Sequence, residues 1–245
     1  MSSAAPVIAI DGPSASGKGS VAQRVAARLG FHYLDSGAIY RATAVAAARA
    51  GLPIDGPGAE AGLAACAARM DLAFAADRVL LGAADVTDAV RSEEGGRNAS
   101  RIAALPGLRA ALLERQRAFR RAPGLVADGR DMGTVVFPDA RLKVFLTASV
   151  AVRALRRARQ LCPPPDPGGS PNGLMQKEKG ATLRAPFDAV LAQVTADLNE
   201  RDRRDRERAA APLLQAGDAR ELDTSAMSID EAVDAVCEWY RSSGD

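Results

Sequence analysis

One stretch near the start of the chain has the residue types and spacing of a phosphate-binding loop. Glycine stands at positions 12, 17 and 19, and Lys18 lies between the last two. Glycine lets a loop turn several backbone N–H groups toward one anion and allows close approach of the backbone. Lys18 would add a mobile positive charge for the β- and γ-phosphates of a nucleotide. The residues expected to bind the nucleotide phosphates are Gly12, Pro13, Ser14, Ala15, Ser16, Gly17, Lys18, Gly19 and Ser20.

The segments on either side of this loop support a phosphate site. Residues 6–11 form an apolar run suited to a buried strand, and residues 21–29 carry apolar residues at helical spacing. A helix that begins at the loop would offer its free N–H groups and positive dipole end to the anion. An ordinary glycine turn before a helix is the alternative, but both flanks fit the phosphate-binding loop.

Acidic and basic residues follow another apolar run, at 125–128. Asp128 closes this run, which is where P-loop proteins place an acidic residue that helps to hold Mg²⁺. We expect Asp128, through a water molecule, and Ser20 to serve the metal; an Asp that caps a turn is the alternative. Arg130 and Asp131 come next and could bind a phosphate and a base edge, whereas a surface ion pair would also explain Arg130.

A second apolar run, 31–35, also ends in polar groups. Asp35-Ser36-Gly37 is followed by Tyr40 and Arg41. Arg41 would lie in the first turns of a helix, where the dipole does not favour a cation. A phosphate partner would explain its position, and simple exposure to solvent is the alternative.

The stretch 186–210 predicts a long helix with a face that changes character. Its apolar stripe consists of Phe187, Val190, Leu191, Val194 and Leu198. The same face continues into Arg201, Arg204, Asp205 and Arg208. Buried charges without partners are costly, so an anionic ligand would account for them, although charge runs more often face solvent.

Another arginine cluster is predicted on a helix over 149–161. Arg153, Arg156 and Arg157 share one face, which suits either a phosphate clamp or solubility. The following segment 162–173 holds five prolines and three glycines and predicts a loop. The two arginine-bearing helices could therefore move as a lid, which we expect over 151–204.

The positions of the elements predict an α/β, three-layer P-loop fold. Five short strands, near 6–11, 31–35, 125–128, 141–147 and 220–224, alternate with helices and imply a mainly parallel five-stranded sheet. Ligands bind at the carboxyl ends of the strands in such sheets. Residues 71–87 predict three short antiparallel strands. We expect these strands to lie within an inserted subdomain over 63–104. Helices are predicted at 63–70, 92–104 and 108–121, and Pro106-Gly107 divides the last two.

Composition narrows the class of protein. The 245 residues fit one domain, and 32 basic against 30 acidic residues give no global attraction to nucleic acid or membranes. Three scattered cysteines indicate reduced thiols, and the single histidine, His32, excludes a multi-histidine metal site. We expect His32 to pack on a strand or lie at the surface, and Trp239 and Tyr240 to pack the last helix onto the sheet. No apolar run reaches about 18 residues and Met1–Ala5 does not resemble a secretory signal, so we expect a cytoplasmic protein.

Four segments together resemble the bacterial cytidylate kinases, which are P-loop nucleoside monophosphate kinases. The segments are Ile10–Ser20, Leu34–Arg41, Asp128–Pro138 and Arg201–Leu213, and the resemblance covers nearly the whole chain. Asp-Ser-Gly-Ala-Ile-Tyr-Arg and Asp-Gly-Arg-Asp-Met-Gly-Thr are far more specific than the glycine loop. The order Lys-Gly-Ser at 18–20, unusual for a general P-loop, is similar to the family's own loop. The chain departs from the family at 162–182, which is longer and richer in proline and glycine.

The resemblance implies transfer of the γ-phosphoryl group of ATP to CMP or dCMP with Mg²⁺, and an enlarged monophosphate-binding role for the 63–104 insert. It implies that Ser36, Arg41 and Arg130, with Tyr40 beside them, bind the acceptor nucleotide. Ser100, Arg109 and Asp131 would recognise cytosine. Arg201 and Asp205 would meet the ribose, Arg208 the phosphates, and Arg157 the donor nucleotide. Lys18, Arg130 and Arg208 would act on the transferring group.

Three other functions fit parts of the sequence. A P-loop regulatory switch should carry a guanine-recognition motif such as Asn-Lys-x-Asp, and the sequence has none. A kinase of a small metabolite is disfavoured by the arginine-rich acceptor side. A nucleic-acid-binding protein that uses 201–208 is disfavoured by balanced charge and the lack of interleaved aromatic residues. We expect small-molecule substrates, no nucleic-acid or membrane partner, and a monomer.

Overall fold

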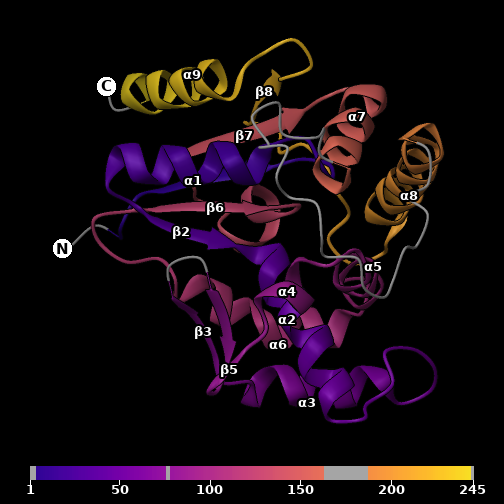
Figure 1. The fold of residues 1–245 in the computed structure, drawn as a ribbon. Helices are drawn as coiled ribbons and strands as arrows, with labels where there is room; N and C mark the ends of the chain where they lie inside the picture. Colours follow the sequence, from indigo (N-terminus) through magenta and orange to yellow (C-terminus); the bar gives the residue numbers. More distant parts are fainter. Residues whose placement is uncertain (1–3, 76–77, 163–186, 244–245) are drawn as a thin grey trace, which may run out of the picture.

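A parallel sheet of five strands forms the centre of the protein (Figure 1). The computed structural model describes residues 4–75, 78–162 and 187–243. The strand order is β2-β6-β1-β7-β8, and each neighbouring pair is parallel. The strands are β1 (Val7–Asp11), β2 (His32–Asp35), β6 (Leu125–Gly129), β7 (Leu142–Thr147) and β8 (Arg220–Asp223). This sheet confirms the predicted α/β class and five parallel strands.

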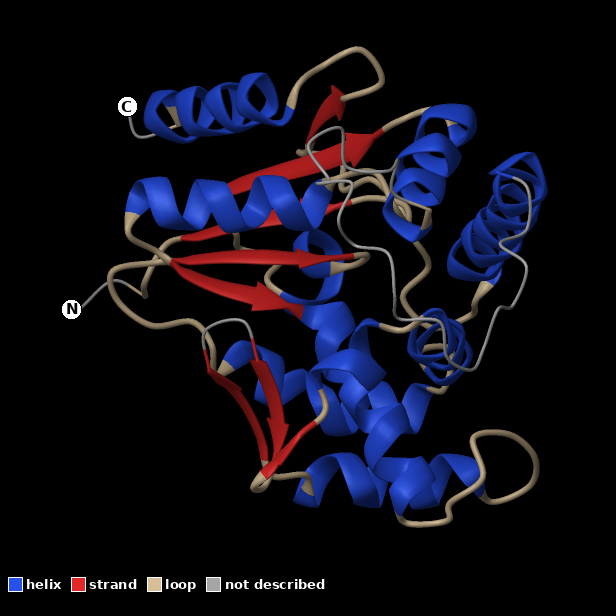
Figure 2. Cartoon of the chain, in the orientation of Figure 1, coloured by secondary structure: helices blue, strands red, loops and turns tan. Residues whose placement is uncertain are grey.

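Both faces of the sheet are buried, which explains the continuous apolar runs of its strands. Alternate side chains of β1 point to opposite faces. Ile8 and Ile10 pack with α1 (Lys18–Leu29) and α9 (Ile229–Ser242), whereas Val7 and Ala9 pack with α2 (Ser36–Arg49). Figure 2 shows the resulting layers, in which helices cover the strands on both sides.

A second, smaller unit of structure lies between α2 and β6 in the sequence. Its three antiparallel strands are β3 (Leu72–Ala75), β4 (Arg78–Leu81) and β5 (Ala84–Asp85). Its helices are α3 (Ala59–Arg69), α4 (Thr87–Arg91), α5 (Glu93–Ile102) and α6 (Pro106–Arg117). The small sheet and α3 lie away from the parallel sheet in Figure 1.

Several predicted boundaries in this region are wrong. Helix α3 begins at Ala59 rather than near 63, after Gly58 in a left-handed conformation. The third strand ends at Asp85, because the Asp85 carboxylate accepts the N–H of Thr87 at 2.9 Å and α4 begins there. The predicted division into two helices is confirmed, but the break lies at 103–105, and Pro106 begins α6, where its missing N–H costs nothing.

The arginine-bearing helices are α7 (Val150–Leu161) and α8 (Phe187–Glu207), and they contact each other. Most of the proline- and glycine-rich stretch predicted as a loop, and the corresponding part of the 151–204 lid, lies outside the described residues. The turn after β6 is a short π-type helix, η1 (Met132–Val136), which the sequence pattern did not predict.

Three minor expectations are met. Trp239 and Tyr240 are half-buried and pack α9 against the cluster that includes β1 and α1. His32 is exposed, with its Nε2 at 3.0 Å from the carbonyl oxygen of Ala122. Cys66, Cys162 and Cys237 are free thiols. Among the described residues, no helix combines the length and apolarity needed to cross a membrane.

Candidate active site

A cleft of about 820 Å³ opens at the carboxyl ends of β1, β2 and β6. One wall is the loop that precedes α1, and the opposite wall comes from α5, α6 and α8. Most of the predicted site residues line the cleft. They are Ser14, Ala15, Ser16, Gly17, Lys18, Gly19, Ser20, Ser36, Tyr40, Arg41, Ser100, Arg109, Asp128, Arg130, Asp131, Arg157, Arg201, Asp205 and Arg208. The two that do not are Gly12 and Pro13, which lie at the base of the loop.

Two glycines fix the shape of the phosphate-binding loop. A Cβ atom on Gly12 would lie 2.1 Å from the carbonyl oxygen of Leu146, so only glycine fits beneath β7. Gly17 precedes α1 with a left-handed φ of 93°. The loop therefore leaves β1 in a fixed direction and presents the free N–H groups of the first turn of α1 to the cleft.

Lys18 lies at the centre of this wall. Its Nζ donates to the carbonyl oxygen of Pro13 at 3.3 Å and lies 3.8 Å from Asp128 Oδ1. Burial and the charge of Arg130 lower the pKa of Lys18 to about 8, and Asp128 opposes that change. Burial also raises the pKa of Asp128, against the effect of Lys18.

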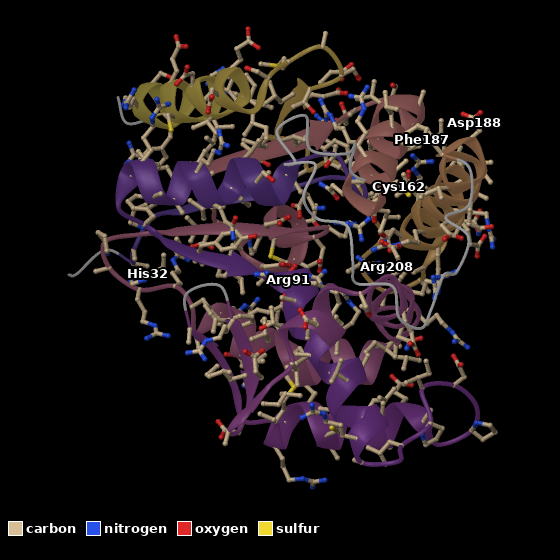
Figure 3. The ribbon with its side chains drawn as sticks, in the orientation of Figure 1. His32, Arg91, Cys162, Phe187, Asp188 and Arg208 are labelled. Carbon is tan, nitrogen blue, oxygen red and sulfur yellow. The ribbon has the colours of Figure 1, made fainter. Side chains whose placement is uncertain are left out.

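The opposite wall carries a buried arginine–carboxylate pair. Arg109, from α6, makes an ion pair with Asp131, which is 4% exposed. Arg208 Nη2 lies 4.0 Å from the other oxygen of Asp131. Arg208, which is labelled in Figure 3, directly follows the last residue of α8. Burial raises the pKa of Asp131, although the charges of Arg109 and Arg208 act in the opposite direction. The predicted cytosine-binding residues Arg109 and Asp131 are therefore in direct contact.

Arg130 connects the two walls. Its Nε donates to Asp205 Oδ2 of α8 at 2.8 Å, and its Nη2 donates to the Ser14 hydroxyl at 2.8 Å. Burial acts to raise the pKa of Asp205, but the charge and hydrogen bond of Arg130 bring it below its ordinary value. Arg130 therefore bonds to the loop that precedes α1 and to α8 at the same time.

The residues after β2 form a similar arrangement. The Asp35 carboxylate caps α2 by accepting the N–H of Ala38, and it also accepts from Arg41 Nη2 at 2.7 Å. Asp35 thus partly neutralises Arg41, although the Nε of Arg41 is buried without a hydrogen-bond partner in the protein. Ser36 donates its hydroxyl proton to the carbonyl oxygen of Asp128, which joins the ends of β2 and β6.

The inward charged face of α8 differs in part from its prediction. Val194, Leu198 and Asp205 are buried as expected, and burial lowers the pKa of Arg201 to about 10. Arg204 is only partly buried, pairs with Glu200 and donates to the Ser100 hydroxyl at 3.1 Å.

The structure corrects the proposed clamp of Arg153, Arg156 and Arg157. Arg153 is 2% exposed, donates to the carbonyl oxygens of Ser14 and Ala148, and lies 2.6 Å from Asp202. It joins the phosphate-binding loop to α8 and cannot reach a ligand. Arg156 donates to the backbone of Ser16 and Thr224. Arg157 makes an ion pair with Glu93 of α5 at the edge of the cleft.

Sequence reasoning missed several residues that support the site from behind its lining. Asp202 was missed because an apolar stripe gives no sign of a buried ion pair beside it. Tyr33, whose hydroxyl donates to Asp128 at 3.3 Å, looked like an ordinary strand residue. Asp11 carried a usable signal, because it closes an apolar strand as Asp35 and Asp128 do. Burial raises its pKa to about 7, although hydrogen bonds from Gly133 and Met132 lower it.

A parallel sheet, a glycine loop with Lys18 before a helix, and an arginine-rich wall across the cleft define a P-loop fold of the nucleoside monophosphate kinase type. Comparison with known proteins agrees. The family model described as "Cytidylate kinase" matches residues 8–165 and 176–242. The chain belongs to the cytidylate kinase family.

Full-length relatives give the same assignment. A protein named cytidylate kinase from Bordetella bronchiseptica is 52% identical over 239 residues, which are 98% of this chain and 96% of the relative. The cytidylate kinase of Methylococcus capsulatus is 54% identical over 235 residues, 95% of each chain. That of Paraburkholderia phymatum is 53% identical over 237 residues, 97% of this chain and 93% of the relative. Residues 166–175 fall between the two parts that match the family model, within the segment where the sequence departs from the family.

Proposed function

We propose that the protein transfers the γ-phosphoryl group of ATP to CMP or dCMP, giving ADP and CDP or dCDP. The observation that carries the proposal is the buried Arg109–Asp131 pair, which lies across the cleft from the phosphate-binding loop in a chain of the cytidylate kinase family. The Asp131 carboxylate can accept a hydrogen bond from the exocyclic amino group of cytosine, and Arg109 can donate to the ring acceptors.

The chain's own residues supply orientation and positive charge. The loop 12–20 binds the ATP phosphates, and Lys18, Arg130 and Arg208 neutralise charge on the transferring group. Arg41 and Arg130 bind the acceptor phosphate, with Ser36 and Tyr40 beside them, and Arg201 and Asp205 meet the ribose. Arg157 turns from Glu93 toward the donor nucleotide. No general base is required, because the acceptor phosphate is already an anion.

The residues fit a magnesium ion that is carried mainly by the nucleotide. Asp128 Oδ1 is buried and has no hydrogen-bond partner in the protein, and Ser20 lies in the first turn of α1. No cluster of three or more potential ligands among His, Cys, Asp and Glu occurs in the described parts of the chain. We therefore assign Ser20 to the ion directly and Asp128 through water. When bound, Mg²⁺ would neutralise phosphate charge.

The remaining proposals concern context. Residues 63–104, which include α5, form the monophosphate-binding subdomain, and 151–204 form the lid of a single kinase domain. We propose a cytoplasmic monomer without nucleic-acid or membrane partners; the three free thiols support a reducing compartment. Light scattering after size exclusion tests the oligomeric state, and a mass near twice 25.5 kDa would reject the monomer.

A coupled ADP-release assay with ATP and Mg²⁺ tests the function. CMP, dCMP, UMP, AMP and a sample without acceptor are compared side by side. Strong turnover with CMP and dCMP alone is expected. Equal turnover with UMP or AMP would still support a nucleoside monophosphate kinase, but it would reject the recognition of cytosine by Ser100, Arg109 and Asp131. Nucleotide binding without turnover on any acceptor would instead favour a P-loop switch.

A further inference from the structure

Asp11 is a buried acidic residue that has no part in the mechanism above. It is the last residue of β1, it is 5% exposed, and Gly12 of the phosphate-binding loop follows it. Its Oδ1 accepts the N–H of Met132 at 2.8 Å, and its Oδ2 accepts the N–H of Gly133 at 2.8 Å. One carboxylate thus joins the start of the phosphate-binding loop to the turn that carries Asp131.

The peptide unit between Asp131 and Met132 is held at both of its polar groups. Asp11 binds its N–H, while its carbonyl oxygen accepts from the N–H groups of Val135 at 2.9 Å and Val136 at 3.1 Å. A peptide unit is planar and includes the Cα atoms on either side. Holding both groups therefore fixes the position of the Asp131 Cα, from which the side chain extends.

Asp11 is itself a rigid reference point. Its backbone pairs with Gly129 in β6 and Phe145 in β7, so strands lie on both sides of it. Gly12 next to it contacts the carbonyl oxygen of Leu146 too closely for any side chain. A shift of the Asp11 carboxylate away from η1 would have to move the central strand of the sheet.

We propose that Asp11 is a positioning residue that holds Asp131 in place for the acceptor base and thereby sets the preference for cytosine over uracil. This inference rests on the proposed function. Cytosine presents an amino donor where uracil presents a carbonyl oxygen, so a fixed carboxylate gains a hydrogen bond from one base and meets an unfavourable acceptor in the other. An Asp131 that can turn aside loses part of this discrimination.

A purely structural role for Asp11 is the rival explanation. The first N–H groups of a helical turn have no partner within the turn, and a buried donor left without one is costly. That role alone predicts lower stability and an unchanged choice of base. The two explanations therefore separate on selectivity rather than on the melting temperature.

The test is Asp11→Asn in the full chain, assayed with CMP and UMP over a range of acceptor and ATP concentrations. The oxygen of the introduced side-chain amide can still accept from the N–H of Met132. Its NH2 group would then face the N–H of Gly133, and two donors cannot form a hydrogen bond with each other. We expect the ratio of kcat/KM for CMP to that for UMP to fall about tenfold, mainly through KM for CMP. KM for ATP should stay within about threefold of wild type, since the phosphate-binding loop keeps its backbone.

Val233→Ala is the matched control. Val233 is 4% exposed, packs between α9 and the sheet and does not line the cleft, so its truncation should lower stability without moving Asp131. Its CMP-to-UMP ratio should equal that of wild type. If Asp11→Asn melts at a lower temperature but keeps the wild-type ratio and KM for CMP, Asp11 is only structural and the inference is overturned.

Gly133→Ala keeps the test decisive if Asp11→Asn fails to fold. The added Cβ would lie 3.1 Å from Lys143 Cδ and 3.4 Å from Asp11 Oδ2, so it displaces the turn slightly while Asp11 remains. We expect the same loss of selectivity, smaller in size, and an unchanged ratio would overturn the inference. Failure of the wild-type enzyme to phosphorylate CMP would instead overturn the proposed function, and the wild-type sample with CMP reveals this outcome.

Discussion

The two walls of the cleft are built in different ways. The loop 12–20, which we call the phosphate-binding wall, consists of backbone N–H groups from one continuous stretch, with a single buried cation, Lys18. The opposite side of the cleft, which we call the acceptor wall, consists of charged side chains from several separate elements. Most of its cations are already paired with carboxylates, as in Arg109–Asp131, Arg130–Asp205 and Arg41–Asp35.

This difference teaches how each wall keeps its shape without a ligand. Backbone groups of a loop are fixed by glycine geometry and need no counter-charge. Buried guanidinium groups need partners, because an unpaired buried charge is strongly unfavourable. The carboxylates on the acceptor wall therefore hold the arginines in place.

Removal of the single cation from the phosphate-binding wall should give the largest effect. We expect Lys18→Ala to lower kcat about 1,000-fold, because Lys18 is the one cation that the loop 12–20 itself supplies to the transferring phosphoryl group. Steady-state kinetics measure the loss, and circular dichroism should show an unchanged fold. Near-normal turnover would contradict the assignment of chemistry to this loop.

Separation of the two walls should give the next largest effect. Arg153 joins the loop to α8 through Asp202, and Asp202→Ala leaves that arginine buried without its counter-charge. We expect the free energy of unfolding to fall by about 3–5 kcal/mol, measured by urea denaturation. The double variant Arg153→Met with Asp202→Leu should recover most of this loss, and no recovery would argue against a buried ion pair as the cause.

A change of hydrogen-bonding type on the acceptor wall should alter selectivity without affecting ATP. In Asp131→Asn, an amide replaces the carboxylate acceptor, and an amide nitrogen can donate to the carbonyl oxygen of uracil. We expect kcat/KM for CMP to fall about 10- to 100-fold, with a smaller fall for UMP. KM for ATP is the internal control; an equal loss for both pyrimidines would contradict base recognition by Asp131.

The smallest expected effect is a dependence of kcat/KM for ATP on pH, which arises from Lys18 on the phosphate-binding wall. The pKa of Lys18 in the free protein is lowered to about 8, so the lysine loses its proton and charge as the pH rises above that value. We expect kcat/KM for ATP to fall about fivefold between pH 8 and pH 9, as the protonated fraction of Lys18 falls. Lys18→Arg keeps its charge in this range and should give a flat profile, whatever its absolute rate. A flat wild-type profile would show that Lys18 stays protonated.

The sequence by itself determined the parallel sheet and the phosphate-binding loop. Both depend on local information: apolar runs bounded by polar strand ends, and glycines at fixed spacing before a helix. Asp35, Asp128 and Arg130 were also visible as polar residues at strand ends.

Only the tertiary structure decided which charged residues meet. Arg153 and Asp202 are far apart in the sequence and look like members of exposed charge runs, yet they form a buried pair. Asp11 and Met132 are joined because β1 and β6 are neighbours in the sheet. Strand order and helix packing set such long-range contacts, and no local spacing records them. The loop between β1 and α1 could therefore be predicted from local sequence, whereas the pairing of the charged side chains across the cleft could not.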